Sequence, residues 1–133
     1  VQLKHIFSWK DEKGVSHDFE MDLSPITDFG FGSKTISRQK PASFRWSGLP
    51  LGKGETIVFL WENAALGKTV PMEIYNTGGM PIIEFPAAQI AKLDAGTWTL
   101  YLVRKKLTKT DADGVANSGI IEYYTKTDTI EVK

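Results

Sequence analysis

Two segments of the chain, 55–62 and 97–104, carry large apolar side chains at consecutive positions, and this constrains the fold more than any other feature. Alternate residues of a β-strand point to opposite faces, so a strand with one face in water alternates apolar with polar residues. Here both faces are apolar, which predicts two central strands covered on each side. The opposed sets are Ile57, Phe59 and Trp61 against Val58 and Leu60, and Trp98, Leu100 and Leu102 against Tyr101 and Val103.

Residues 1–24 follow the simpler alternation of half-buried strands. Two alternating runs flank the polar turn 11–14, which ends in glycine. This predicts an antiparallel, amphipathic hairpin in which Trp9 lies opposite Val15. The apolar face of this hairpin must be covered, so we expect the hairpin to pack over the second face of the central strands. The alternative is that the second face of the central strands is an oligomer contact. The second face consists of Val58, Leu60, Tyr101 and Val103.

Local signals predict three further elements. Pro86, followed by good helix formers as far as Leu93, predicts one short helix. The apolar parity of the C-terminal strand switches near residues 126–128, which predicts a β-bulge. The polar segment 105–118 is expected to be a loop, and its length marks it as a functional or mobile element.

Composition excludes several classes of chemistry. The chain has 133 residues and no cysteine, so disulfides, thiolate nucleophiles and cysteine-ligated zinc are excluded. Sixteen basic residues balance sixteen acidic ones, which leaves no overall field to attract nucleic acid. Apolar runs fall far short of the ~20 residues of a membrane helix, so we expect no membrane insertion. We expect no cofactor.

The order of elements resembles a fibronectin type III or related immunoglobulin-like sandwich over residues 25–133. Phe44-Arg45-Trp46 is similar to the second strand of that family, which often ends in tryptophan before a proline-containing turn, here Pro50. The run from Leu93 to Leu100 is similar to the family's approach to its penultimate strand. The family usually has tyrosine where this chain has Trp98, and the tyrosine hydroxyl makes a corner hydrogen bond.

The resemblance implies one all-β domain over residues 1–133, an antiparallel immunoglobulin-like β-sandwich (25–133) with the hairpin of residues 1–24 packed on it. Such sandwiches serve as adhesins, spacers and receptor modules, so we expect a non-catalytic module that binds a glycan or a protein at a cell surface. The alternatives are a structural spacer or oligomerisation domain, and a small carbohydrate-active enzyme. An extracytoplasmic location is expected from the family and from the start at Val1 without methionine.

Candidate binding residues come from exposed aromatics and from the end loops 48–54, 76–79 and 105–118. An aromatic at a strand end can stack on a sugar, and Gly, Asn, Asp and Lys in loops supply hydrogen-bonding groups. Metal binding is not expected, because His5 and His17 lack a third ligand and the Asp-rich loop fails the spacing of a calcium loop. An irregular calcium loop at Asp111 and Asp113 stays open. The candidate ligand-binding residues are Trp9, Trp61, Tyr75, Asn76, Lys109, Asp111 and Asp113.

Overall fold

The computed structural model describes residues 3–10, 12–75, 77–112 and 115–133. This part of the chain is almost entirely strand, with one short helix, which confirms the all-β prediction. The elements are β1 (Leu3–Lys10), β2 (Ser16–Leu23), β3 (Thr27–Gly30), β4 (Thr35–Ile36), β5 (Ala42–Ser47), β6 (Glu55–Asn63), β7 (Lys68–Ile74), β8 (Ile82–Phe85), α1 (Ala87–Ile90), β9 (Gly96–Ala112), β10 (Val115–Tyr124) and β11 (Asp128–Val132).

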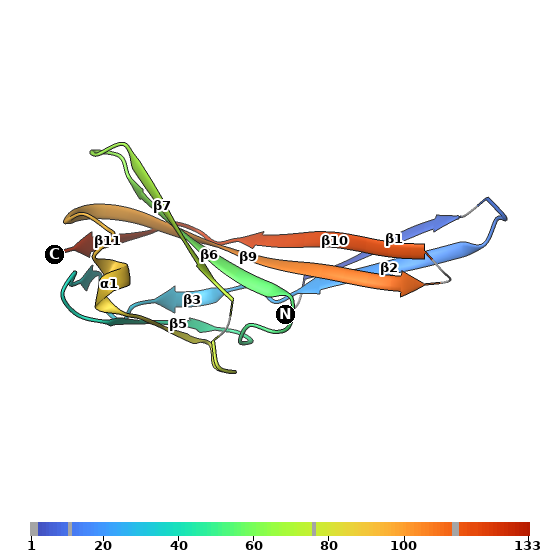
Figure 1. The fold of residues 1–133 in the computed structure, drawn as a ribbon, viewed down its shortest axis with the longest axis horizontal. Helices are drawn as coiled ribbons and strands as arrows, with labels where there is room; N and C mark the ends of the chain where they lie inside the picture. Colours follow the sequence, from blue (N-terminus) through green and yellow to red (C-terminus); the bar gives the residue numbers. More distant parts are fainter. Residues whose placement is uncertain (1–2, 11, 76, 113–114) are drawn as a thin grey trace.

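Two sheets form the body of the molecule. The smaller sheet has the order β3-β5-β8, and the larger has the order β4-β11-β9-β6-β7 with β10 also paired to β9. All pairings are antiparallel except that of β11 with β4. The β1–β2 hairpin forms a separate two-stranded sheet. The molecule is elongated, because the β9–β10 pair and the β1–β2 hairpin project together from one end of the body (Figure 1).

The core lies between the two sheets and is rich in aromatic rings. Phe59 of the larger sheet contacts Phe44 and Phe85 of the smaller one edge to face, with ring centroids 4.7 and 4.9 Å apart. Such contacts follow from alternation, since the inward residues of each strand meet those of the facing sheet. The other large, fully buried side chains of this core include Ile57, Trp61, Ile90, Leu93, Trp98, Leu100 and Leu102.

The predicted central strands are confirmed. β6 pairs with β7 on one side and β9 on the other, and β9 pairs with β6, β10 and β11. β10 and β11 follow one another along the same edge of β9. Tyr124 pairs with Val103, and Asp128 pairs with Leu100. The chain therefore advances four residues from Tyr124 to Asp128 while β9 advances only three, and this extra residue confirms the predicted β-bulge.

The prediction of a loop over residues 105–118 is wrong. β9 continues to Ala112 and β10 begins at Val115, so this segment is a long two-stranded ribbon, which we call the arm. β6 ends its pairing with β9 at Lys106, so the arm continues beyond the central part of the larger sheet and requires fewer apolar residues. Threonine favours strands, and the sequence Asp-Gly is typical of two-residue hairpin connections, so the polar pattern is compatible with a β-ribbon.

The hairpin prediction is confirmed in outline and wrong in register and placement. Trp9 pairs with His17 rather than Val15, because five residues connect the strands, whereas pairing of Trp9 with Val15 would leave three. β2 contacts β9 and β10 on the inner side of the arm. There Leu23 and Ile121 are buried together, and Lys106 Nζ lies 2.8 Å from an oxygen of Asp22. The hairpin therefore does not cover the opposite face of the larger sheet.

Candidate functional site

The outer face of the larger sheet has an apolar centre. Cross-strand register places Leu60 between Pro71 and Tyr101, and Val58 lies beside Val103 in the next row. Val58 and Val103 are buried by their neighbours, whereas Leu60 and Tyr101 are half exposed. The structure thus brings together all four residues predicted to form an interface, and the N-terminal hairpin leaves their face uncovered.

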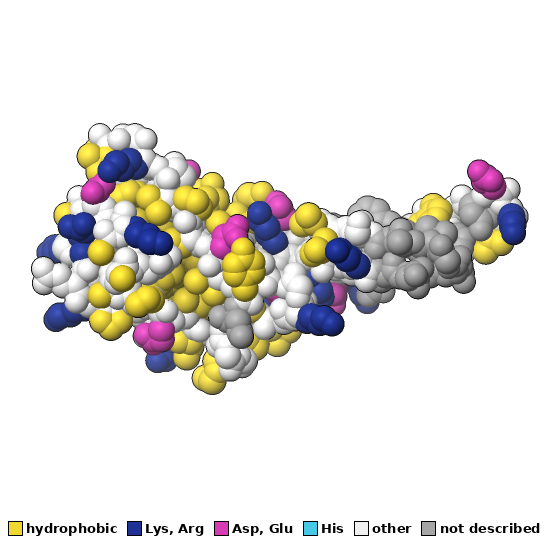
Figure 2. All heavy atoms as spheres, in the orientation of Figure 1, with side chains coloured by type: hydrophobic (Ala, Val, Ile, Leu, Met, Phe, Trp, Pro, Cys, Tyr) yellow, Lys and Arg dark blue, Asp and Glu magenta, His cyan; other side chains and the backbone are white. Residues whose placement is uncertain are grey.

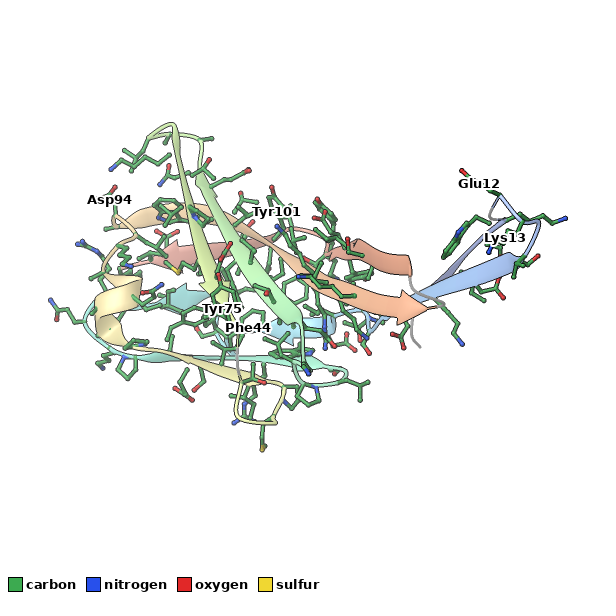
Figure 3. All side chains as sticks on the ribbon, turned by 45° about the vertical axis from the view of Figure 1, so that its right-hand side comes forward. Glu12, Lys13, Phe44, Tyr75, Asp94 and Tyr101 are labelled. Atoms are coloured by element: carbon green, nitrogen blue, oxygen red, sulfur yellow. The ribbon has the colours of Figure 1, made fainter. Side chains whose placement is uncertain are left out.

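Each edge of this face carries a tyrosine next to a glutamate. On β10, the Tyr124 hydroxyl donates to Glu122 Oε2 at 2.6 Å. On the opposite edge, the hydroxyl of Tyr75, directly after β7, donates to a carboxylate oxygen of Glu73. Tyr75 is 67% exposed and Tyr124 is 60% exposed. Tyr75 follows β7 and Tyr101 lies on β9 (Figure 3).

Both glutamates raise the pKa of the tyrosine beside them. The hydrogen bond from the neutral phenol to Glu73 is the main cause at Tyr75, and the negative charge of Glu73 adds to it. Glu122 acts in the same way on the pKa of Tyr124, with a smaller contribution from the nearby Tyr101. Both phenols therefore remain neutral donors at physiological pH.

The apolar surface continues from this face onto the arm. Lys105 lies between Thr56 and Glu122 in the next row, and Leu107 pairs with Ile120 in the row beyond. Leu107 is 44% exposed and Ile120 is 61% exposed. Figure 2 shows hydrophobic side chains spread over the surface of the body, with lysines and arginines between them. We call the surface formed by Val58, Leu60, Pro71, Glu73, Tyr75, Tyr101, Val103, Lys105, Leu107, Ile120, Glu122 and Tyr124 the outer face.

The candidate ligand-binding residues do not converge on one site. Trp61 is completely buried in the core, so it cannot act as an exposed platform. Trp9 is half-buried against the Leu23 cluster, and Tyr75 belongs to the edge of the outer face. Lys109 and Asp111 lie on β9 in the arm, paired with Ser118 and Ala116. Asn76 and Asp113 lie outside the described residues, as do the side chains of Asp111, His5 and His17.

Buried Arg104 anchors the end loop 48–54, which was expected to hold ligand contacts. Its Nε and Nη2 each lie 2.6 Å from Glu55 Oε2. Nη1 donates to the carbonyl of Leu49 at 2.9 Å, and Nη2 donates to that of Pro50 at 2.8 Å. The indole N–H of Trp46 donates to the same Leu49 carbonyl. These inward hydrogen bonds give the loop a structural role at the base of the arm.

A second concave region lies beside β3. An open hollow of about 470 Å³ is lined by Phe29, Phe31, Ser43 and two residues of opposite charge, Asp28 and Arg45. Asp28 has a φ of 45°, which is unusual for a residue other than glycine. The neighbouring glycines Gly30 and Gly32 are the sequence signal that indicates irregular backbone in this region.

The outer face also includes residues that the sequence reasoning missed, namely Glu73, Glu122 and Tyr124. The available signal was the repeated Glu-x-Tyr spacing, at Glu73 and Tyr75 and again at Glu122 and Tyr124. Residues two apart in a strand share a face, so this spacing permits the hydrogen bond seen in both pairs. The sequence pattern alone does not place the two pairs on opposite edges of one sheet.

Comparisons with protein-family models, curated proteins and solved structures give no match for this chain. Across the residues that the structure describes, no helix has the length and apolar character to span a membrane. Within the same residues, no group of three or more His, Cys, Asp or Glu is placed to hold a metal ion. The outer face and the hollow beside β3 are therefore the two candidate sites on the described residues.

Proposed function

We propose that this chain is a non-catalytic, immunoglobulin-like module of the fibronectin type III kind. The arrangement of strands supports this class. β3, β5 and β8 would be the first, second and fifth strands of the family, with β6, β9 and β11 as the third, sixth and seventh in the other sheet. Trp98 supports it as well, since its indole N–H donates to the Asp94 carbonyl at 2.8 Å, a bond comparable to that of the family's corner tyrosine.

The module would act outside the cytoplasm and bind a protein through the outer face. The observation that carries this proposal is an open apolar centre, formed around Leu60 and Tyr101, between two tyrosine-bearing edges. Protein interfaces combine a poorly charged centre with a polar rim and are enriched in tyrosine. A tyrosine supplies a large rigid contact area together with one hydrogen-bonding group, and few rotamers are lost when it is fixed.

Site-specific photo-crosslinking tests this function. Tyr124 is replaced by p-benzoylphenylalanine in the full chain, which is then irradiated in the organism that produces it. Ser47, exposed on the outer side of the smaller sheet, receives the same replacement as a control. We expect a discrete adduct, identified by mass spectrometry, from position 124 and not from position 47. Equal labelling from both positions would contradict a docking role for the outer face.

A glycan-binding function is the second candidate, and the hollow beside β3 is the observation that favours it. Asp28 and Arg45 line one concave surface without forming an ion pair with each other. A carboxylate and a guanidinium can each hydrogen-bond two sugar hydroxyls, and a hollow of this size is within the range of ligand pockets. Retention on immobilised xylan, mannan or β-glucan that is lost on Arg45→Ala and kept on Leu60→Lys would favour this function.

A further inference from the structure

We propose that the occupant of the outer face is a second copy of this chain, packed sheet on sheet about a two-fold axis. This inference rests on the proposed function and specifies its partner. The axis would run parallel to the strands, between β6 and β9. It would therefore bring β7 of each copy over β10 of the other, and β6 over β9.

Register makes the row through the centre self-complementary under this axis. The row contains, in order, Glu73, Val58, Val103 and Tyr124. The two-fold axis reverses the row, so Val58 meets Val103 of the second copy and Glu73 meets its Tyr124. Val58 and Val103 are only 6% and 3% exposed, so they form the base of this row and the apolar contact itself comes from the half-exposed residues of the next row. Glu73 would accept the hydrogen bond of Tyr124 of the second copy, which exchanges its bond to Glu122 for one across the interface.

The adjacent rows are complementary in the same sense. Leu60 would meet Tyr101 of the second copy. In the row containing Lys105 and Glu122, Thr56 would meet Lys105, and Tyr75 at the edge would meet Glu122. No two charges of the same sign face each other in these three rows. Each glutamate at the rim faces a tyrosine hydroxyl, which would exchange its bond to the glutamate of its own copy for one across the interface.

Realistic packing angles preserve this arrangement. Aligned sheets pack at about 30° to each other rather than at zero. β7 and β10 lie about 7 Å from the axis at a strand spacing of about 4.8 Å, so this rotation displaces the edge rows by about 4 Å. Tyrosine and glutamate side chains are long enough to reach across that displacement.

Edge-to-edge pairing is the competing way to join two sheets, and the sequence opposes it on β7. This strand forms one edge of the larger sheet, and Pro71 in its middle has no backbone N–H to donate. On the opposite side, the edge consists of β4, which has only two residues, and of β10 beside β9. β10 is therefore the edge at which pairing competes with the face, and Leu60→Lys separates the two arrangements, because Leu60 lies on β6 in the interior of the sheet. The face spans four strands, about 19 Å, which makes the interface small and the dimer weak and concentration-dependent.

Sedimentation velocity over a wide concentration range tests the dimer. The wild-type chain should pass from monomer to dimer as its concentration rises, and Leu60→Lys should weaken association by at least about tenfold. Ser47→Lys, which introduces the same ammonium group on the outer side of the smaller sheet, is the matched control and should associate like the wild type. Circular dichroism and thermal melting establish that each variant is folded.

A charge-exchange pair tests the register. Tyr75→Glu should weaken association by placing a carboxylate opposite Glu122 of the second copy, and Glu122→Lys should weaken it by removing the acceptor. The double variant should restore association, because the carboxylate introduced at position 75 would then face the ammonium group introduced at position 122 of the second copy. Within one copy these positions are three strand spacings apart, about 14 Å, so the rescue cannot arise inside a monomer.

Three results would overturn the proposal: a wild-type chain that stays monomeric at all concentrations, a dimer unaffected by Leu60→Lys, or a double variant no stronger than its single variants. The crosslinking experiment separates this failure from that of the proposed function. A monomeric chain whose position 124 still captures a different, identified protein would retain the outer face as a docking surface and exclude only the second copy.

Discussion

Replacing Arg104 by methionine should cost more stability than any single change on the surface of this molecule. Methionine keeps an unbranched apolar stem but removes every donor of the guanidinium. Glu55, whose side chain is only 12% exposed, then loses its ion pair, and the Pro50 carbonyl loses its hydrogen bond. The Leu49 carbonyl keeps the indole N–H of Trp46.

The magnitude follows from these losses. A buried carbonyl left without a donor costs about 1–3 kcal/mol, and breaking a buried ion pair from one side costs about 3–5 kcal/mol in total. We therefore expect Arg104→Met to lower the free energy of unfolding by about 3–5 kcal/mol. At about 3–5 °C per kcal/mol for a chain of this size, the melting temperature should fall by about 9–25 °C.

Urea unfolding followed by tryptophan fluorescence measures this loss. Adding Glu55→Gln to Arg104→Met removes the unpaired carboxylate, so the double variant should recover part of the stability. Arg45→Met is the matched control, because Arg45 is exposed and its loss should change stability by less than about 0.5 kcal/mol. A loss below about 1 kcal/mol for Arg104→Met, or no recovery in the double variant, would refute this reasoning.

Three further predictions concern the arm and its base. Lys106 holds the pKa of Asp22 below its usual value, so Lys106→Met should raise that pKa in an NMR titration. The ion pair stabilises the fold above the ordinary carboxyl pKa, and the stability gap between the two proteins should close as pH falls through the lowered value. Glu122→Gln should lower the raised pKa of Tyr124 in an ultraviolet titration. The neutral phenol donates the hydrogen bond to Glu122, so the stability that this bond contributes is lost only as pH rises through the raised pKa. Gly54→Ala should lower the free energy of unfolding by about 1–3 kcal/mol, measured by urea unfolding, because φ is 75° and the new Cβ would lie 2.8 Å from a β9 carbonyl oxygen. The glycine of the β6–β7 turn has open space around it and should lose less on the same change.

The body of the fold was predictable because its signals are local. Apolar residues on both faces of 55–62 and 97–104 predict central strands, and the structure places β6 and β9 at the centre of the larger sheet. The predicted layer on each side is correct for the inner face only, since Leu60 and Tyr101 of the outer face are half exposed. The parity switch near residues 126–128 likewise predicts the bulge before β11. In each case the side chains that produce the signal are the ones that pack.

The arm and the hairpin register were not predictable for a related reason. A ribbon that extends beyond the body, as 105–118 does, needs few apolar residues, so its composition resembles that of a loop. The register of the hairpin depends on the length of its turn, and two more residues there move the partner of Trp9 from Val15 to His17. Neither the arm nor the register of the hairpin changes the periodicity of apolar residues in the sequence.

The candidate site was predictable only in its apolar part. Val58 and Leu60 are recognisable in the sequence because they make the second face of a strand apolar when its first face is already apolar. Tyr124 stands on a different strand, far along the chain, and its place beside Val103 depends on the pairing of β10 with β9. The rim of the outer face is therefore a property of the assembled sheet rather than of any segment.

The position of β11 determines how the C-terminal end responds to mechanical force. β11 lies between β4 and β9, and its backbone is held on both sides, with Lys133 exchanging hydrogen bonds with Ile36 and Arg38. Tension applied along β11 loads both ladders in shear, so their hydrogen bonds resist together instead of opening one at a time. A neighbouring domain attached after Lys133 would therefore pull on one of the most resistant strands of the body, and the rate of forced unfolding would be set by the simultaneous rupture of both ladders.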